Sequence, residues 1–190
     1  MKNKNRILSS ILSLCLMAGL ALPASAADIS TSGGTATTPV QLTAEATTFD
    51  VTVPTGIAIQ VNADGTVTCP AASAVKITNN SAGAVKVTNI AMNNGTWTLA
   101  SYNGGSRAAL AAEKVDAKKL GFQLSVTGDT AATASDGSQT LTHNAAKWII
   151  DPNEDLEITT AAIATAVSSA ISEAETAANV VFTIGWNTAA

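Results

Sequence analysis

The stretch AVKITNNSAGAVKVTNI, residues 74–90, indicates the class of fold. Its two halves alternate, with Val and Ile on one face and Lys and Thr on the other, and NNSAG between them is rich in turn-forming residues. A strand with one apolar and one polar face is typical of an antiparallel sheet that buries one side. The stretch therefore predicts two antiparallel strands joined by a turn at residues 79–83.

The same alternating pattern recurs along the rest of the chain. IAIQV (residues 57–61) and TVTC (66–69) flank NADG (62–65), and Asp-Gly between alternating runs is a strong hairpin signal. The closing run NVVFTIGW (179–186) is the strongest strand prediction. Further strands are expected in the runs at residues 40–44, 49–53, 96–102, 121–126, 140–142, 148–150 and 156–159.

We count about nine strands among these runs, several of which are short. Their close spacing predicts an all-β fold, an antiparallel immunoglobulin-like β-sandwich with one or two short helical or loop insertions. Residues 108–119 are one such insertion. Residues 161–178 are ambiguous. Their apolar residues Ile163, Val167 and Ile171 are spaced by four, as in a helix, whereas the many Thr and Ser residues disfavour one, so helix and strand plus loop both stay open. The expected inter-sheet core consists of Phe49, Val51, Val53, Ile77, Val85, Val87, Trp97, Phe122, Ile149, Phe182 and Ile184.

The N-terminus has the three parts of a secretory signal peptide. A basic hexapeptide, an apolar stretch over residues 7–22 and the small-residue cleavage site Ala24-Ser25-Ala26 follow one another. We therefore assign residues 1–26 to a signal peptide, 27–39 to a flexible N-terminal arm and 40–190 to a single β-sandwich domain. This predicts a secreted protein of the cell surface or cell wall, with no integral membrane segment after signal cleavage.

The charge of the secreted part excludes two classes of partner. Without residues 1–26 the chain keeps 7 of its 10 Lys and Arg and all 14 Asp and Glu, a net charge of about −7. Such a chain, with no cluster of basic residues, can neither neutralise phosphates nor bind anionic lipid through a polybasic patch. We therefore expect no nucleic-acid partner.

The sequence offers few groups for catalysis. His143 is the only histidine, whereas catalytic triads and most zinc sites need His as a base or ligand. We expect no catalytic residue, metal or cofactor, and hence no enzyme. The acidic turn at residues 151–157 has oxygen ligands that suit calcium but not the spacing of an EF-hand, so a solvated turn is favoured. Cys69, the only cysteine after residue 26, is a half-buried small residue, the site of an intermolecular disulfide or a reactive thiol.

The tryptophans are the candidate ligand-binding residues. Trp97, Trp148 and Trp186 would stack on sugar rings if they lined one exposed face. Leu99 is a fourth candidate because it lies two residues after Trp97, in the run Trp97-Thr98-Leu99. Each tryptophan also lies in an alternating run, so burial in the sandwich core is the alternative interpretation.

Several segments resemble known surface proteins. FDVTVPT (49–55), the NADGTVT hairpin, the quoted stretch at 74–90 and the closing VVFTIGW are similar to small secreted surface proteins of Gram-positive, gut-type bacteria. Trp97-Thr98-Leu99 also resembles the WxL motif, which implies non-covalent binding to the cell wall. The Leu of a second copy is missing after Trp186, where Asn187 and Thr188 follow.

A second resemblance is to the TasA/camelysin group of biofilm-matrix proteins. It rests on the signal peptide, the polar arm, the strand–NNS–strand segment and the F-x-x-x-W pattern from Phe182 to Trp186. The resemblance implies a sandwich that polymerises by passing an N-terminal strand to a neighbour. A metalloprotease activity, also attached to that family, would need metal ligands that this sequence does not show.

Two functions follow as hypotheses. The first is a non-enzymatic structural protein of the bacterial cell surface or extracellular matrix, which forms a homo-oligomer or fibre when residues 40–46 add as a strand to another copy. For that segment, an intramolecular edge strand behind a disordered terminus is the simpler interpretation. The second function is a non-covalent module that binds peptidoglycan or another glycan.

Overall fold

The computed structural model describes residues 32, 40, 42–102, 110, 112–130, 132–133, 135 and 137–188. The predicted signal peptide, and the predicted arm apart from residue 32, lie outside the described residues. The chain divides into two compact units, Met1–Ala44 and Glu45–Ala190. All strands of the described residues belong to the second unit.

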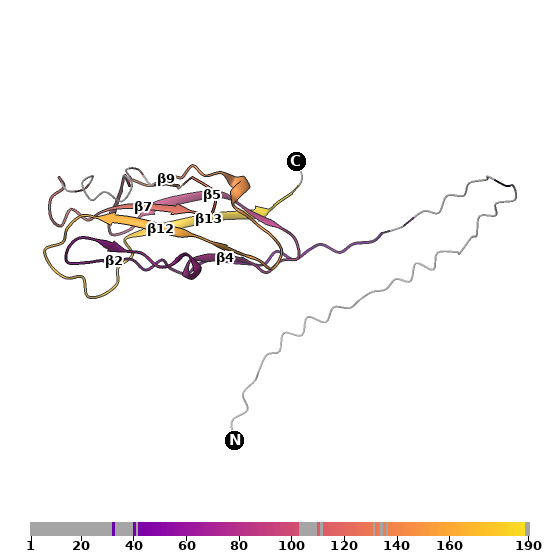
Figure 1. Cartoon of the computed structure of the whole chain (residues 1–190), viewed down its shortest axis with the longest axis horizontal. Coiled ribbons are helices and arrows are strands. Elements are labelled where there is room, and N and C mark those ends of the chain that lie inside the picture. Colours follow the sequence, from indigo (N-terminus) through magenta and orange to yellow (C-terminus); the bar gives the residue numbers. More distant parts are fainter. Residues whose placement is uncertain are drawn as a thin grey trace, which may run out of the picture. The chain divides into compact units, whose positions relative to one another are not determined.

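The described part of the chain is almost entirely β-structure (Figure 1). Two short 3-10 helices are the exceptions, η1 (Ala72–Ala74) and η2 (Ala145–Lys147). The strands are β1 (Val51–Thr52), β2 (Gln60–Val61), β3 (Val67–Thr68), β4 (Lys76–Asn79), β5 (Val85–Asn94), β6 (Thr98–Ala100), β7 (Lys119–Ser125), β8 (Ala132–Thr133), β9 (Gln139–Thr140), β10 (Ile149–Ile150), β11 (Asp155–Glu157), β12 (Thr159–Ala164) and β13 (Ala178–Trp186).

The strands form two layers. One layer is the sheet β10-β5-β13, in which β9 also pairs with β5. The other layer combines the sheets β1-β4-β11, β12-β7-β6 with β8 on β7, and the hairpin β2-β3. These sheets join because β11 leads directly into β12 and β3 lies against β12. The predicted all-β sandwich is confirmed, with one exception to antiparallel pairing: β6 and β7 are parallel.

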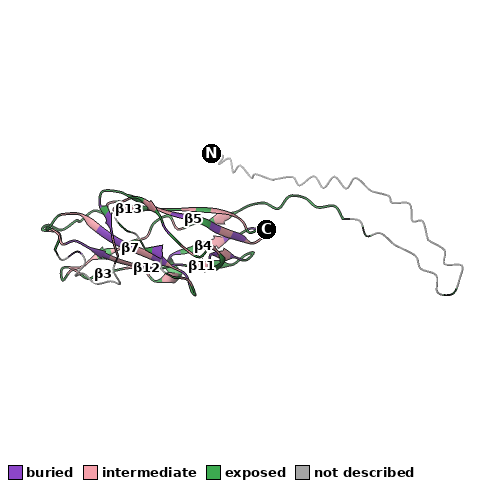
Figure 2. Cartoon of the chain, turned by 90° about the horizontal axis from the view of Figure 1, so that it is seen from above, coloured by how far each residue is buried: buried purple, intermediate pink, exposed green. Residues whose placement is uncertain are grey.

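A single main core lies between the layers (Figure 2). Strand β5 contributes Val85, Val87, Ile90 and Met92, whose alternation shifts by one residue at Thr88, and β7 adds Phe122. Of the predicted core residues, Ile77 and Trp97 are also buried, whereas Phe49 and Val53 are exposed. They are exposed because β1, the strand between them, lies at a sheet edge with β4 as its only strand partner in the described residues. The remaining predicted core residues are partly buried: Val51, Ile149, Phe182 and Ile184.

The predicted turn at residues 79–83 proves to be a crossing between layers. β4 and β5 do not pair with each other; β4 pairs with β1 and β11, and β5 pairs with β13. The buried Asn79 explains the crossing. Its Nδ2 donates to the carbonyl oxygens of Gly83, Ile150 and Asp151, and its Oδ1 accepts from the backbone N–H of Ser81. The hairpin prediction for the stretch 74–90 was therefore wrong, although both of its strands exist.

Three other expectations are settled by pairing partners. The hairpin at 62–65 is confirmed, since β2 and β3 pair antiparallel across it and Gly65 has φ 81°. The strand expected at 40–44 is absent from its described residues, none of which has a ladder partner. The ambiguous run 161–178 is strand plus loop: β12 ends at Ala164, and the chain continues without regular structure until β13.

Candidate functional site

The two layers leave a trough open along one side of the sandwich. Its volume is about 1250 Å³. Residues 54–61 form one wall, and the first half of β13 with the loop at residues 166–177 forms the other. Met92, Trp97 and Phe122 reach it from the core. The trough is thus an opening from the surface into the inter-sheet core.

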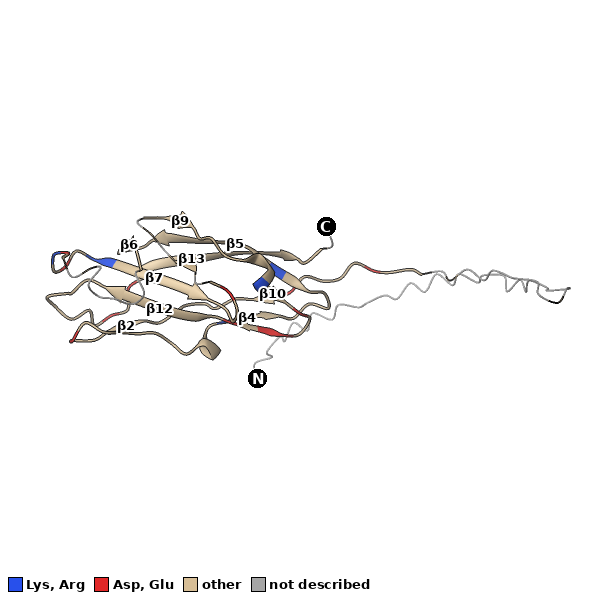
Figure 3. Ribbon diagram, turned by 45° about the horizontal axis from the view of Figure 1, so that its top comes forward, with Lys and Arg blue, Asp and Glu red and all other residues tan. Residues whose placement is uncertain are grey.

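The edge of β13 borders this trough. Among the described residues β5 is the only strand that pairs with β13, so the other side of this nine-residue strand has no ladder partner. Val180 and Phe182 pack against the core, while Val181 points outward and is 45% exposed. No residue of β13 is charged, and none is Pro (Figure 3). Proteins usually block such an edge with charge, Pro, a bulge or a covering segment. The register shift at Thr183/Ile184 does not do so, because its extra residue is Thr88 of β5.

The facing wall also lacks strand pairing. Residues 53–59 form no strand and, within the described part of the chain, no hydrogen bond. Ile57 and Ile59 nevertheless pack against the core. Most of this segment is exposed, so its backbone groups are left to bond with water or with another chain. Both walls of the trough therefore expose backbone groups that an extended segment can pair with.

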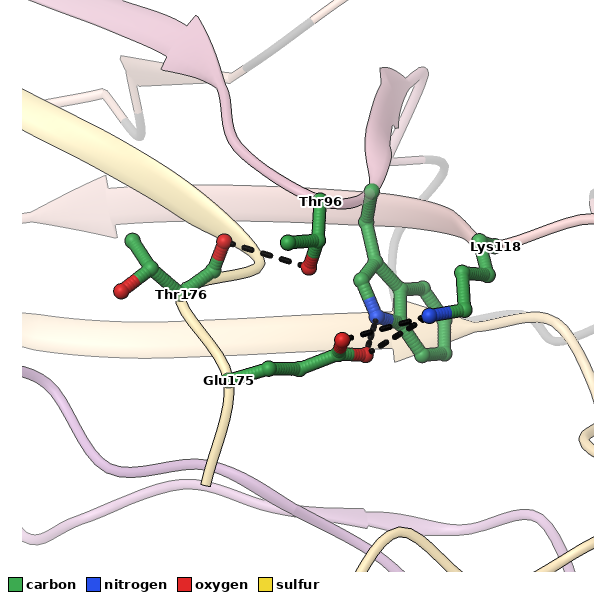
Figure 4. Close-up of polar contacts among 5 residues, drawn as sticks. Thr96, Lys118, Glu175 and Thr176 are labelled. Atoms are coloured by element: carbon green, nitrogen blue, oxygen red, sulfur yellow. Dashed lines mark hydrogen bonds and ion pairs between the residues drawn. The ribbon is translucent and has the colours of Figure 1, made fainter. Parts of the chain in front are cut away.

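The loop at residues 166–177 is held near its C-terminal end by the carboxylate of Glu175 (Figure 4). Glu175 accepts a hydrogen bond from the indole Nε1 of Trp97, and Lys118 donates to the same carboxylate at 3.2 Å. The hydrogen bond from Trp97, followed by that from Lys118, lowers the pKa of Glu175 below its ordinary value of 4.5. Thr96 Oγ1 adds a bond to the carbonyl of Thr176 at 3.3 Å.

The loop is also held near its N-terminal end, where Ser168 donates hydrogen bonds to the carboxylate of Asp116. Both carboxylate oxygens of Asp116 accept from Ser168, one from its backbone N–H at 2.8 Å and one from its hydroxyl at 2.6 Å. These two bonds hold the pKa of Asp116 below its ordinary value. The backbone N–H of Asp116 donates in turn to the carbonyl of Ala166. The loop wall is therefore anchored at two points rather than free.

Aromatic packing lies beyond the trough, at the C-terminal end of β13. Phe49 meets Trp186 edge-on with ring centroids 5.1 Å apart, and the Trp186 indole covers Gly83. The residues that line the trough include Val180 and Phe182 of β13 but none beyond them. The trough thus lies beside the first half of the strand.

The four candidate ligand-binding residues do not share an exposed face. Trp97, Leu99 and Trp148 are buried in the core, and only Trp186 keeps partial exposure. The indole Nε1 of Trp148 donates to Asp129 at 2.7 Å, which satisfies its polar atom inside the fold. A buried ring cannot stack on a sugar, so the alternative interpretation, burial in the core, holds for Trp97 and Trp148.

The other polar candidates have structural contacts. The ring of His143 packs edge-on against Trp148 at 5.7 Å and its Nε2 lies 3.3 Å from the carbonyl oxygen of Val87. In the acidic turn, Asp155 is bonded to Lys76 at 2.6 Å. Within the described residues no three His, Cys, Asp or Glu side chains gather as a metal site. Cys69 is partly buried, and burial raises the pKa of its thiol.

Comparisons with known proteins add no relative. No family model, no curated protein and no solved structure matches this chain. In the part of the chain that the structure describes, no helix has the length and apolar character needed to cross a membrane. The candidate site therefore rests on geometry alone. The sequence analysis did not predict the trough, because alternation locates strands but does not show which strand edges stay open. The one sequence signal for it was the run at residues 178–186, which contains no charged residue.

Proposed function

We propose that this chain is a non-enzymatic, secreted structural protein of the bacterial cell surface or extracellular matrix that self-associates by strand addition. The single observation that carries the proposal is the long, uncharged edge of β13 beside a trough that opens into the core. An added strand gains main-chain hydrogen bonds from such an edge and buries alternate side chains in the groove.

The donor in this proposal is the segment at residues 40–46 of another copy. Its sequence VQLTAEA alternates apolar and polar residues, as a strand with one buried face requires. Val40 is 96% exposed and Leu42 88% exposed, so both are free to bury apolar surface elsewhere. Burying a side chain of this size contributes about 1.5–3 kcal/mol. The signal peptide predicted at residues 1–26 supports an assembly outside the cell.

The first test compares the mature chain, residues 27–190, with residues 47–190. We expect fibres or large oligomers for the longer protein and monomers for the shorter one, measured by light scattering across concentration with negative-stain imaging. Polymers that survive the truncation would rule out residues 40–46 as the donor.

A matched pair of variants separates strand insertion from a general effect of the arm. Leu42→Asp places a charge on the apolar face and should abolish assembly. Thr43→Asp places the same charge on the polar face and should leave the molar mass of the assembly unchanged. Equal effects of the two variants would contradict insertion of one face into a trough.

A wall- or glycan-binding module is the second candidate function. One observation favours it: Trp186 and Phe49, which is 43% exposed, form an aromatic pair at the surface. Retention on insoluble peptidoglycan that is lost in Trp186→Ala, with the fold intact by circular dichroism, would support this function. A monomer that is not retained at low salt would exclude it.

A further inference from the structure

We infer that the added strand runs parallel to β13, with Val40 beside Val180, Leu42 beside Phe182 and Glu45 beside Gly185. This inference rests on the proposed function and names the orientation and register of the donor. Two independent features of the acceptor support it, the position of the trough and the position of one lysine.

The trough lies beside only the first half of β13. Its lining includes residues 177–180 and Phe182, and the floor there is formed by core residues such as Met92 and Phe122. At the other end of this strand, Trp186 fills the space between Phe49 and Gly83. Large donor side chains therefore fit beside the first half of β13, and small ones beside the second half.

The donor has a matching gradient of size. On its apolar face, Val40 and Leu42 come first, and Ala44 and Ala46 follow. A parallel donor places the two large side chains in the trough and the two alanines beyond it. An antiparallel donor places the alanines in the trough and leaves it unfilled, and poorly filled space between packed groups is destabilising.

Charge gives the second argument. Gly185 pairs with Lys86 of β5, and the alternation of β5 puts Lys86 on the outer face between the buried Val85 and Val87. Within the described residues Lys86 has no salt bridge. A parallel donor puts Glu45 on the same face, one strand beyond Gly185, which has no side chain to intervene.

The lysine and the glutamate are then within reach of each other. Two strand spacings separate their backbones by about 10 Å, a span that extended Lys and Glu side chains cover together. The antiparallel arrangement instead brings Glu45 to the row of Val181 and Ala91, where neither neighbour is charged. Opposite charges in register favour the parallel strand.

Disulfide cross-linking between two different molecules tests the orientation. All proteins are the mature chain, residues 27–190, and carry Cys69→Ser, so each has only the thiol that is introduced. The donor protein carries Glu45→Cys and a mass tag, and it is mixed with one acceptor protein carrying Gly185→Cys, Val181→Cys or Asn179→Cys. A β-carbon at Gly185 meets no atom within 4 Å, so that substitution fits.

Under a mild oxidant we expect the tagged heterodimer with Gly185→Cys to form at least about tenfold more than with either other acceptor, because only adjacent residues meet disulfide geometry. Preferential cross-linking to Val181→Cys or Asn179→Cys would overturn the parallel orientation and leave strand addition intact. Oligomers that cross-link to none of the three acceptors would overturn β13 as the acceptor. A mature chain that stays monomeric without any substitution would overturn the proposed function itself.

A charge exchange provides an independent readout by light scattering. Lys86→Glu should lower the molar mass of the assembly, and the double variant Lys86→Glu/Glu45→Lys should restore it. Lys147→Glu, which lies in η2 and precedes β10 on the other side of β5 from β13, is the matched control and should change nothing. Failure of the double variant to restore assembly would contradict the register.

Discussion

Replacing the buried Asn79 by Ala should destabilise the fold much more than replacing its exposed neighbour Asn80. Asn79 is fully buried where the chain crosses from one layer to the other. Its amide donates to three carbonyl oxygens, those of Gly83 (2.9 Å), Ile150 (3.0 Å) and Asp151 (3.1 Å). Its Oδ1 accepts from the backbone N–H of Ser81 at 3.0 Å. The side chain thus joins the crossing segment to the end of β10.

The magnitude follows from the number of bonds. The amide nitrogen has two hydrogens, which the three carbonyl oxygens share, so together with the bond to Oδ1 the side chain makes the equivalent of three hydrogen bonds. A typical intramolecular hydrogen bond contributes about 1 kcal/mol net, and buried groups left without a partner cost more. Some of the carbonyls are only partly buried and can bind water after the substitution. We therefore expect Asn79→Ala to lower the free energy of unfolding by about 3–4 kcal/mol.

Asn80→Ala is the matched control. The two asparagines are neighbours, but Asn80 is exposed and its amide makes one bond, to the hydroxyl of Thr52 at 3.1 Å. Its loss should cost at most about 0.5–1 kcal/mol. Urea unfolding followed by tryptophan fluorescence measures both variants. Costs within about 0.5 kcal/mol of each other would refute the assignment of Asn79 as the residue that stabilises the crossing.

Three further predictions concern the core, the loop wall and a close backbone contact. Phe122→Ala should cost about 3–5 kcal/mol in urea unfolding, and Phe182→Ala, which is only partly buried at the trough, about half of that; equal costs would mean that the trough is closed in solution. Because the folded-state pKa of Glu175 is lowered, its carboxylate stabilises the fold above the ordinary value of 4.5 and loses this effect as the pH falls through the lowered value. The melting-temperature advantage of the parent protein over Glu175→Gln should therefore shrink between pH 7 and pH 3, and an advantage that stays constant with pH would contradict this assignment. Gly95→Ala would put its β-carbon into the backbone oxygen of Thr176 and should cost at least about 2 kcal/mol, whereas Gly56→Ala meets no atom within 4 Å and should be nearly neutral. Equal melting temperatures of the two variants in thermal denaturation would contradict this close approach.

Local sequence patterns predicted the strands well and their partners poorly. The runs at 121–126 and 179–186 became β7 and β13 because alternation is written in consecutive residues. The hairpin at 62–65 formed as predicted, because a two-strand turn depends mainly on its own residues. The turn at 79–83 has similar chemistry, yet it crosses between layers, since Asn79 finds its partners 71 and 72 residues further along the chain.

The candidate site shows the same division. The sequence identified the tryptophans as notable but not their exposure, and two of the three are buried with their indole N–H groups bonded to Glu175 and Asp129. Neither acidic residue lies near its tryptophan in sequence. The tryptophans therefore do not form one exposed binding face, because Trp97 and Trp148 are buried. The candidate site is instead the open edge of β13.

By itself the sequence determined an acidic, all-β chain of alternating strands behind a predicted signal peptide, because charge, periodicity and turn residues are local properties. Only the tertiary structure decided which strands pair, which aromatic rings are buried and which edge stays open. Those outcomes depend on contacts between residues far apart in the chain, and a strand's own pattern is the same whether its edge is covered or free.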